Sequence, residues 1–160
     1  MKENHFIWWL VEGQTSGMMM PFIDPMRRFQ GQAQLSEFDD ELPVLYAMGI
    51  RSVVSLMNLQ GDKAVYESAG FEFLCSPVKD YHAPTDSQMD EIVAFMEKSS
   101  KAVAVHCEGG LGRTGTILAA WLISRGTQLN EAIKLVREAE PGAIETDRQL
   151  FFLQKYAERF

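Results

Sequence analysis

The chain has 160 residues, of which 46% are hydrophobic and 23% are charged, as in a globular protein with a sizeable core. This length predicts a single domain over residues 1–160. The net charge of −7 argues against nucleic acid and anionic membranes as partners, because both attract basic surfaces. Two cysteines make no disulfide framework, and the polar N-terminus resembles neither a secretory signal nor a membrane span. We therefore expect a reducing compartment, the cytoplasm. We also expect a monomer.

Hydrophobic patterns along the chain predict strands and helices that alternate. This order predicts an α/β domain whose central, largely parallel sheet of about five strands is flanked by helices. The segment 61–70 is predicted to form a loop with a helical turn, and Gly49 and Gly126 are predicted to end helices. Strands are predicted at 6–11, near 16–19, and at 51–57, 71–75 and 102–106. Helices are predicted at about 39–48, from Thr85, at 115–123, from Thr127 and at 146–159.

The turn from His106 to Thr114 is the centre of the prediction. The apolar run Ala102–Val105 precedes it and a helical pattern from Gly115 follows it. A tight turn between a strand and a helix directs backbone N–H groups and the positive end of the helix dipole at one small volume, which suits an anion. The residues expected to ring this anion are Glu108, Gly109, Gly110, Leu111, Gly112 and Arg113.

Cys107 opens the turn and Arg113 closes it. A thiol at a helix N-terminus beside a cation is readily held as a thiolate, which makes Cys107 a candidate nucleophile. The planar guanidinium of Arg113 matches two oxygens of a phosphate. We expect His106 to hydrogen-bond carbonyls of the turn and hold it. The hydroxyl of Thr114 has two possible roles, which are to stabilise the sulfur as a leaving group and to cap the helix.

Hydrolysis of a phosphate monoester also needs a general acid, which must come from another loop. Asp80 lies in the loop 76–84, between a predicted strand and a helix, and prolines stand on both sides of it. It would protonate the leaving oxygen and then activate water. Asp86 is the alternative, but it falls in the first turn of a helix, where an acid is expected because of the helix dipole.

The pattern His106-Cys107-x-x-Gly110-x-x-Arg113-Thr114 resembles the signature of the Cys-based protein tyrosine phosphatase superfamily. The loop 78–84 resembles the general-acid loop of its small atypical dual-specificity branch. The segments 49–56 and 141–146 are similar to compact single-domain members with archaeal and bacterial relatives, and the likeness runs from about Trp8 to the C-terminus.

The resemblance implies a phosphatase-like fold and a two-step reaction through a phosphocysteine, with no metal and no cofactor. Cys107 would be the nucleophile, Arg113 the phosphate clamp, and Asp80 the acid and then the base. In similar compact members a glutamine near Gln149 helps to position water. However, Thr146 and Gln149 also have the spacing of a capping box, as do Thr85 and Gln88, so the role of Gln149 stays open.

The predicted substrate is a phosphoprotein carrying phosphotyrosine and also phosphoserine or phosphothreonine. Family members that act on inositol lipids tend to carry lysines inside the turn, whereas this turn has none and holds Glu108. Its carboxylate should repel a polyanionic headgroup. A phosphatase of inositol lipids or of RNA 5′-phosphates, and a non-catalytic module that binds phosphorylated residues, remain the alternatives.

Two further features allow more than one interpretation. Cys75 is expected in the core of a strand, although some relatives protect their nucleophile by a disulfide to a nearby cysteine. Arg27 and Arg28 form the basic doublet of the chain, which is either a solvated pair or a rim that attracts acidic flanks of a substrate.

Overall fold

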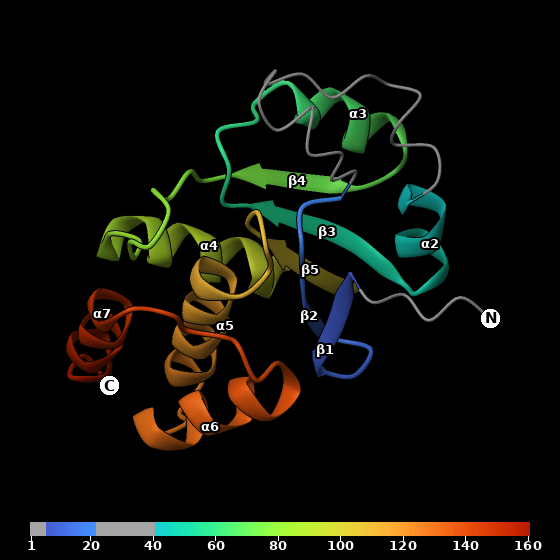
Figure 1. Ribbon diagram of the computed structural model, residues 1–160. Helices are drawn as coiled ribbons and strands as arrows, with labels where there is room; N and C mark the ends of the chain where they lie inside the picture. The colour runs from blue at the N-terminus through green and yellow to red at the C-terminus, as the bar shows by residue number, and fades with distance from the viewer. Residues whose placement is uncertain (1–5, 22–40) are drawn as a thin grey trace.

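The computed structural model describes residues 6–21 and 41–160, and it confirms a five-stranded sheet with helices on both faces (Figure 1). The strands are β1 (Ile7–Val11), β2 (Thr15–Met18), β3 (Ile50–Ser55), β4 (Glu72–Cys75) and β5 (Ala102–His106). The helices are α2 (Glu41–Ala47), α3 (Asp62–Ser68), α4 (Asp86–Lys98), α5 (Gly112–Ser124), α6 (Leu129–Ala139) and α7 (Asp147–Ala157).

The strand order in the sheet is β1-β2-β5-β3-β4. Among the described strands, β1 and β2 pair antiparallel and the other pairs are parallel, so β2, β5, β3 and β4 run in the same direction. The carboxyl ends of parallel strands meet at one edge of the sheet, which is where α/β proteins place their ligands. The turn 107–111 leaves β5 at this edge, and the loop 76–84 leaves β4 at the same edge.

Alternate residues of the central strand β5 enter two separate cores. Val103 and Val105 pack against the face covered by α4, α5, α6 and α7. Ala102 and Ala104 belong to the second core, on the face covered by α2 and α3. Burial on both faces explains why the sequence of β5 is apolar throughout rather than alternating.

Helix α5 is the buried centre of the larger core. Its residues from Gly112 to Ile123 are all buried, in agreement with an apolar pattern on every side of the helix. Gly115 allows the segment after α6 to approach closely, since a Cβ at this position would lie 2.8 Å from Cβ of Ala143. The turn after β5 therefore continues directly into a helix that is buried from Gly112 to Ile123.

The predicted boundaries differ from the observed ones at several ends. Helix α5 begins at Gly112 and not at Gly115, because the glycine-rich turn already adopts helical geometry there. Helix α6 begins at Leu129 and not at Thr127, with Gln128 as its N-cap. The turn predicted within 61–70 is the two-turn helix α3. Local sequence patterns predict the presence of a helix more reliably than they predict its first residue.

Other expectations are confirmed. Both predicted capping boxes form, at the first residues of α4 and α7. Gly49 follows α2 with a φ of 87°, a conformation that glycine adopts without strain. Residues 39 and 40, at the start of the helix predicted at 39–48, lie outside the described residues, as do Arg27 and Arg28. Among the described helices, none is long and apolar enough to cross a membrane.

Gly115→Ala should destabilise the protein, although alanine normally favours a helix by up to about 1 kcal/mol. The added methyl group would lie 2.8 Å from Cβ of Ala143 and 3.0 Å from N of Ile144. We expect a loss of about 1–3 kcal/mol in the free energy of unfolding, measured by urea denaturation. Gly61→Ala is the matched control, because a Cβ at Gly61 meets nothing within 4 Å. Equal stability of both variants would contradict this packing.

Candidate active site

The turn between β5 and α5 is held by donors that bind its carbonyl groups from outside. In a trans peptide the C=O and the following N–H point in opposite directions, so outward carbonyls direct the N–H groups of Gly109, Leu111 and Gly112 inward. Among the described residues, no acceptor binds the N–H of Gly109 or Leu111. This arrangement is a nest of N–H groups suited to an anion. The outside bonds are Met20 N to Glu108 O (2.9 Å), Trp8 Nε1 to Gly110 O (3.3 Å) and Ile144 N to Leu111 O (3.3 Å).

Two glycines of the turn are required by close packing. Gly110 has a φ of 74°, and a Cβ there would lie 2.6 Å from the backbone of Met18. A Cβ at Gly112 would lie 2.7 Å from Oε1 of Glu145 and 3.1 Å from Nε2 of Gln149. The turn is therefore confined between the end of β2 and the segment that enters α7.

Cys107 lies directly after β5, and its side chain is almost fully buried. The hydroxyl of Thr114 donates a hydrogen bond to its sulfur at 3.0 Å. The N-terminus of α5 has no side-chain cap, so the alternative role of Thr114 as a helix cap is wrong. The sulfur faces the N-terminus of α5, whose dipole favours negative charge there.

Arg113 joins the turn to the loop after β4. Its Nη1 donates to the carbonyl of Val78 at 2.9 Å, and its Nη2 lies 3.5 Å from Oδ1 of Asp80. The Arg113 side chain is buried, whereas 55% of the Asp80 side chain is exposed. Its Nε has no hydrogen-bond partner among the described residues, so donors remain for a ligand. Asp86 lies in the first turn of α4, as expected, and Asp80 is the acid beside Arg113.

The loop that carries Asp80 is anchored to the start of α7. The hydroxyl of Thr146 donates to the carbonyl of Tyr81 at 2.9 Å, and Nε2 of Gln149 donates to the carbonyl of His82 at 3.2 Å. Tyr81 has a φ of 64°, and its N–H donates to Oδ1 of Asp80 at 2.9 Å. Such a conformation is strained for tyrosine, and strain of this kind persists where the surroundings enforce it.

Gln149 lies fully buried between the turn and the Asp80 loop. Its Oε1 accepts the N–H groups of Glu145 and Thr146 at 2.8 and 3.1 Å, which completes the capping box. Its amide nitrogen carries two protons, and one of them is used by the carbonyl of His82. The structure thus gives Gln149 a structural role and leaves one N–H for a second role.

His106 is fully buried at the end of β5, and its Nδ1 lies 3.1 Å from the carbonyl of Cys107. Burial lowers the pKa of His106 to about 4; the positive charge of Arg113 adds to this effect, and the bond to Cys107 opposes it. The ring is therefore neutral at pH 7. Because a carbonyl only accepts hydrogen bonds, Nδ1 carries the proton, and the ring holds the backbone of Cys107.

Cys75 lies two strands away from the end of β5. Cys75 and His106, the residue before Cys107, both pair with Ser55 of β3, from opposite sides. Two strand spacings amount to about 9.5 Å between Cys75 and His106, whereas the Cα atoms of a disulfide lie within about 7 Å. The thiol of Cys75 instead donates to the carbonyl of Met57 at 3.1 Å, and burial raises its pKa. The interpretation of Cys75 as a structural residue is the one that fits.

Sequence reasoning missed two supports of the turn. Trp8 lies in the strand predicted at 6–11, but nothing in that prediction indicated that its indole N–H binds the carbonyl of Gly110. Ile144 has a φ of 61°, and Arg137 holds this strained segment by donating to the carbonyls of Ala143 and Ile144 at 3.1 and 2.9 Å. No local pattern marks either contact. Within the residues described, no three His, Cys, Asp or Glu side chains are grouped to hold a metal.

A family model described as "Polymorphic toxin system, DSP-PTPase phosphatase" matches residues 30–127, more than half of the chain. The protein tyrosine phosphatase type IVA 2 of Mus musculus is 32% identical over 129 residues, which cover 78% of this chain and 75% of the mouse protein. The chain belongs to the Cys-based protein tyrosine phosphatase superfamily. Within it, the matches place this phosphatase with the small atypical dual-specificity enzymes.

Solved structures agree with this family. The phosphatase superposes on the active form of Tk-PTP with a TM-score of 0.78 and 32% identity, covering 99% of this chain and 100% of that one. It also superposes on PTPMT1 in complex with PI(5)P with a TM-score of 0.76, covering 96% of each chain. The identity to PTPMT1 is 19%, so this second likeness concerns the fold alone.

Protonation of His106 should destabilise the phosphatase as the pH falls from 6.5 toward 4. Its pKa is lowered from 6.5 to about 4 by folding, so in this window the unfolded chain binds the proton and the folded chain does not. The free energy of unfolding should decrease by at most about 3 kcal/mol more in the wild type than in His106→Gln.

Urea denaturation at pH 7, 5.5 and 4.5 would measure this difference. His82→Gln, which alters a half-buried histidine of the Asp80 loop, is the matched control and should keep the wild-type dependence on pH. If His106→Gln keeps it as well, then the buried ring does not resist protonation as described.

Proposed function

We propose that the chain is a single catalytic domain that hydrolyses phosphotyrosine, and also phosphoserine and phosphothreonine, in proteins. The observation that carries this proposal is the 3.5 Å contact between Arg113 and Asp80. It brings a proton donor to the rim of the same N–H nest that contains the thiol of Cys107. A nest alone binds phosphate, whereas a nest with a nucleophile and an acid supports hydrolysis.

In the first step the thiolate of Cys107 attacks phosphorus in line with the leaving oxygen. The S–P bond forms while the P–O bond to the substrate breaks, and the carboxylic acid of Asp80 transfers its proton to the departing oxygen. The inward N–H groups and the guanidinium of Arg113 neutralise the oxygens that remain on phosphorus. The products of this step are the dephosphorylated substrate and a phosphocysteine.

In the second step the carboxylate of Asp80 takes a proton from water, and the oxygen of that water attacks phosphorus as the proton leaves. The S–P bond breaks and the electron pair returns to Cys107 as a thiolate. The hydroxyl of Thr114 at 3.0 Å stabilises this leaving group. The remaining N–H of Gln149 orients the water, and neutral His106 keeps the backbone of Cys107 in place. No residue in this scheme requires a metal or a cofactor.

Charges near the turn favour a phosphoprotein over a polyanionic substrate. The turn contains no lysine and carries Glu108, and the carboxylate of Glu145 lies against Gly112. Each additional phosphate of an inositol headgroup would meet these carboxylates at the rim. We propose a cytoplasmic monomer whose partner is a phosphoprotein, rather than a nucleic acid or a membrane.

Substitutions of Cys107 and Asp80 test the chemistry. With an aryl phosphate as substrate and a chelator present, Cys107→Ser should be inactive. Asp80→Asn should lower kcat about 10²- to 10⁴-fold, because general acid catalysis contributes that much. Asp86→Asn is the matched control, since Asp86 is an exposed acid in the first turn of α4, and it should retain wild-type activity.

A competing panel of phosphopeptides, inositol phosphates and 5′-phosphorylated RNA tests the substrate class. We expect the highest kcat/KM for a phosphopeptide. A higher kcat/KM for an inositol phosphate or for RNA would contradict the proposed substrate class, but it would leave the proposed reaction mechanism intact. Tight binding of phosphopeptides without turnover would instead identify a binding module. An Asp80→Asn enzyme with full activity would show that another group is the acid.

Thr114→Val should slow the second step more than the first. Loss of a hydrogen bond to a charged group corresponds to roughly 10- to 100-fold in rate. A burst of product followed by slow turnover, measured by stopped flow, would reveal the accumulated phosphocysteine. Thr114→Ser retains the hydroxyl and should restore steady turnover. Equal slowing of both steps in Thr114→Val would assign the hydroxyl a purely structural role.

A further inference from the structure

The loop that carries Asp80 is held near its start by the first turn of α4. Gln88 donates through Nε2 to the carbonyl of Pro77 at 2.8 Å and to the buried hydroxyl of Ser76 at 3.2 Å. The Oε1 atom of the same side chain accepts the N–H of Thr85 at 3.0 Å and so closes the capping box of α4. One amide therefore both caps a helix and fastens the acid loop.

The same arrangement recurs further along the loop, at the first turn of α7. Gln149 closes the capping box of α7 with its Oε1 and donates through Nε2 to the carbonyl of His82 at 3.2 Å. The hydroxyl of Thr146 accepts the N–H of Gln149 at 3.2 Å and donates to the carbonyl of Tyr81 at 2.9 Å. For residues 79–83, the bonds from Thr146 and Gln149 are the hydrogen bonds to another element of the described chain.

Both capping boxes use a glutamine, which indicates more than capping. A glutamate closes a capping box equally well, and its charge suits the positive end of the helix dipole. Only an amide has N–H groups left to donate once its oxygen is used. Gln88 and Gln149 both donate to a carbonyl of the same loop. The amide nitrogens therefore explain a residue type that capping alone leaves open.

Asp80 depends on this support because its own contacts are weak. More than half of its side chain is exposed, and its carboxylate lies 3.5 Å from Nη2 of Arg113. An ion pair that is exposed to solvent contributes little stability. The next residue, Tyr81, has a φ of 64°, which is strained for tyrosine and persists only where the surroundings enforce it. The hydrogen bonds to the backbone of the loop therefore set the position of the acid.

We propose that Gln88 and Thr146 are positioning residues for the general acid of the proposed phosphatase reaction. Each holds the backbone beside Asp80, so that its carboxyl group reaches the leaving oxygen. A displacement of about 1 Å in an active site can cost about 10²-fold in rate. The inference rests on the proposed function, because that function makes Asp80 the acid. Gln149 belongs to the same support, but the proposed second step also uses it, so its variants would not separate the two roles.

Leaving groups of different basicity test this proposal. The phenol of difluoromethylumbelliferyl phosphate is acidic enough to depart without a proton, whereas the leaving group of phenyl phosphate needs the acid. Gln88→Glu keeps the capping box and removes the donor to Pro77. We expect kcat/KM for phenyl phosphate to fall roughly 10- to 100-fold, and kcat/KM for the activated ester to fall less than about threefold.

Variants of Thr146 test the other support. Thr146→Val removes the donor to Tyr81 and should show the same selective loss, whereas Thr146→Ser keeps a hydroxyl and should restore wild-type kcat/KM for both esters. Thr146→Val also weakens a helix cap. Thr85→Ala is the matched control, because it weakens the cap of α4 but leaves the amide of Gln88 in place. Both esters should react with Thr85→Ala as with the wild type.

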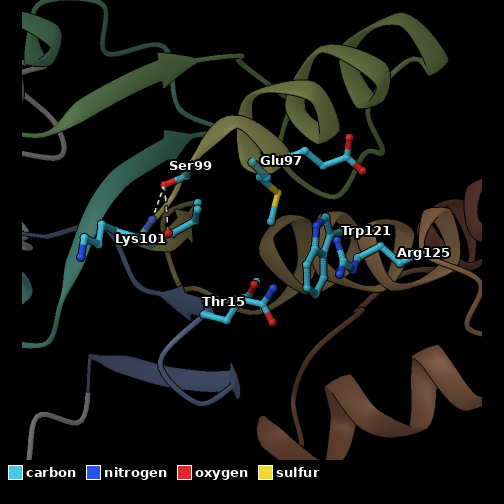
Figure 2. Close-up of a pocket in the computed structure, with 9 residues that line it drawn as sticks. Thr15, Glu97, Ser99, Lys101, Trp121 and Arg125 are labelled. Carbon is cyan, nitrogen blue, oxygen red and sulfur yellow. Dashed lines mark hydrogen bonds between the residues drawn. The ribbon is translucent and has the colours of Figure 1, made fainter.

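A second control changes the charge of α4 away from the loop. Glu97 is exposed in the last turn of α4, nine positions after Gln88, which is about 14 Å along the helix. Figure 2 shows Glu97 beside a cavity near the first residues of β2 and β5. Glu97→Gln alters the net charge by one unit, as Gln88→Glu does, and should leave kcat/KM for both esters unchanged.

A double variant shows whether Gln88 acts through the acid. Added to Asp80→Asn, Gln88→Glu should lower kcat/KM for phenyl phosphate by less than about threefold, because the acid is already absent. A purely structural role of Gln88 would give the full loss again in this background. The two substitutions would then be additive instead of coupled.

Hydrogen exchange of two loop amides measures the support without turnover. The N–H of Tyr81 donates to Oδ1 of Asp80 and the N–H of His82 to the carbonyl of Lys79, and both should exchange faster in Gln88→Glu than in the wild type. Unchanged exchange, an equal loss with both esters, or a full additional loss in the Asp80→Asn background would each overturn the proposal. With an active wild type these results refute this role alone, whereas an inactive wild type refutes the proposed reaction as well.

Discussion

Hydrogen bonds to the outward carbonyls of the turn after β5 are the interaction on which the site depends. They come from the β1–β2 hairpin through Trp8 and Met20, and from the segment before α7 through Ile144. With their carbonyls bound, the peptides of the turn present N–H groups inward before any phosphate arrives. Preorganised donors of this kind need no reorganisation during the reaction, which is how enzymes stabilise developing negative charge most effectively.

Arg113 links this turn to the loop that carries Asp80. One side of its guanidinium holds the carbonyl of Val78 and another faces Asp80, so a single buried side chain connects the two segments. The carboxylate of Asp80 is more than half exposed, and solvent screening makes such a pair a weak source of stability. The contact between Arg113 and Asp80 therefore serves to position Asp80. The strained backbone of Tyr81 indicates that the surrounding fold enforces this position.

Three glycines, which have no side chain, let other segments approach the turn and the start of α5 closely. Gly110 admits the backbone of β2, Gly112 admits Glu145 and Gln149, and Gly115 admits Ala143. These contacts press three distant segments against the turn and the start of α5. These close approaches surround the N-terminal half of a helix that is buried from Gly112 to Ile123. In α/β proteins ligands bind at the carboxyl ends of the strands, which is the edge where this turn lies.

The amino-acid sequence by itself determined the α/β class, both capping boxes and the turn with its cysteine and arginine, because each depends on residues within a few positions of one another. It predicted Asp80 as the acid from loop context, but it did not predict the contact with the guanidinium of Arg113. The tertiary structure alone decided the contacts between Trp8 and Gly110, 102 positions apart, and between Gln149 and His82, 67 positions apart. It also decided that β3 separates Cys75 from His106, the residue before Cys107. Strand order sets such distances, and periodicity along one segment carries no information about which strands become neighbours.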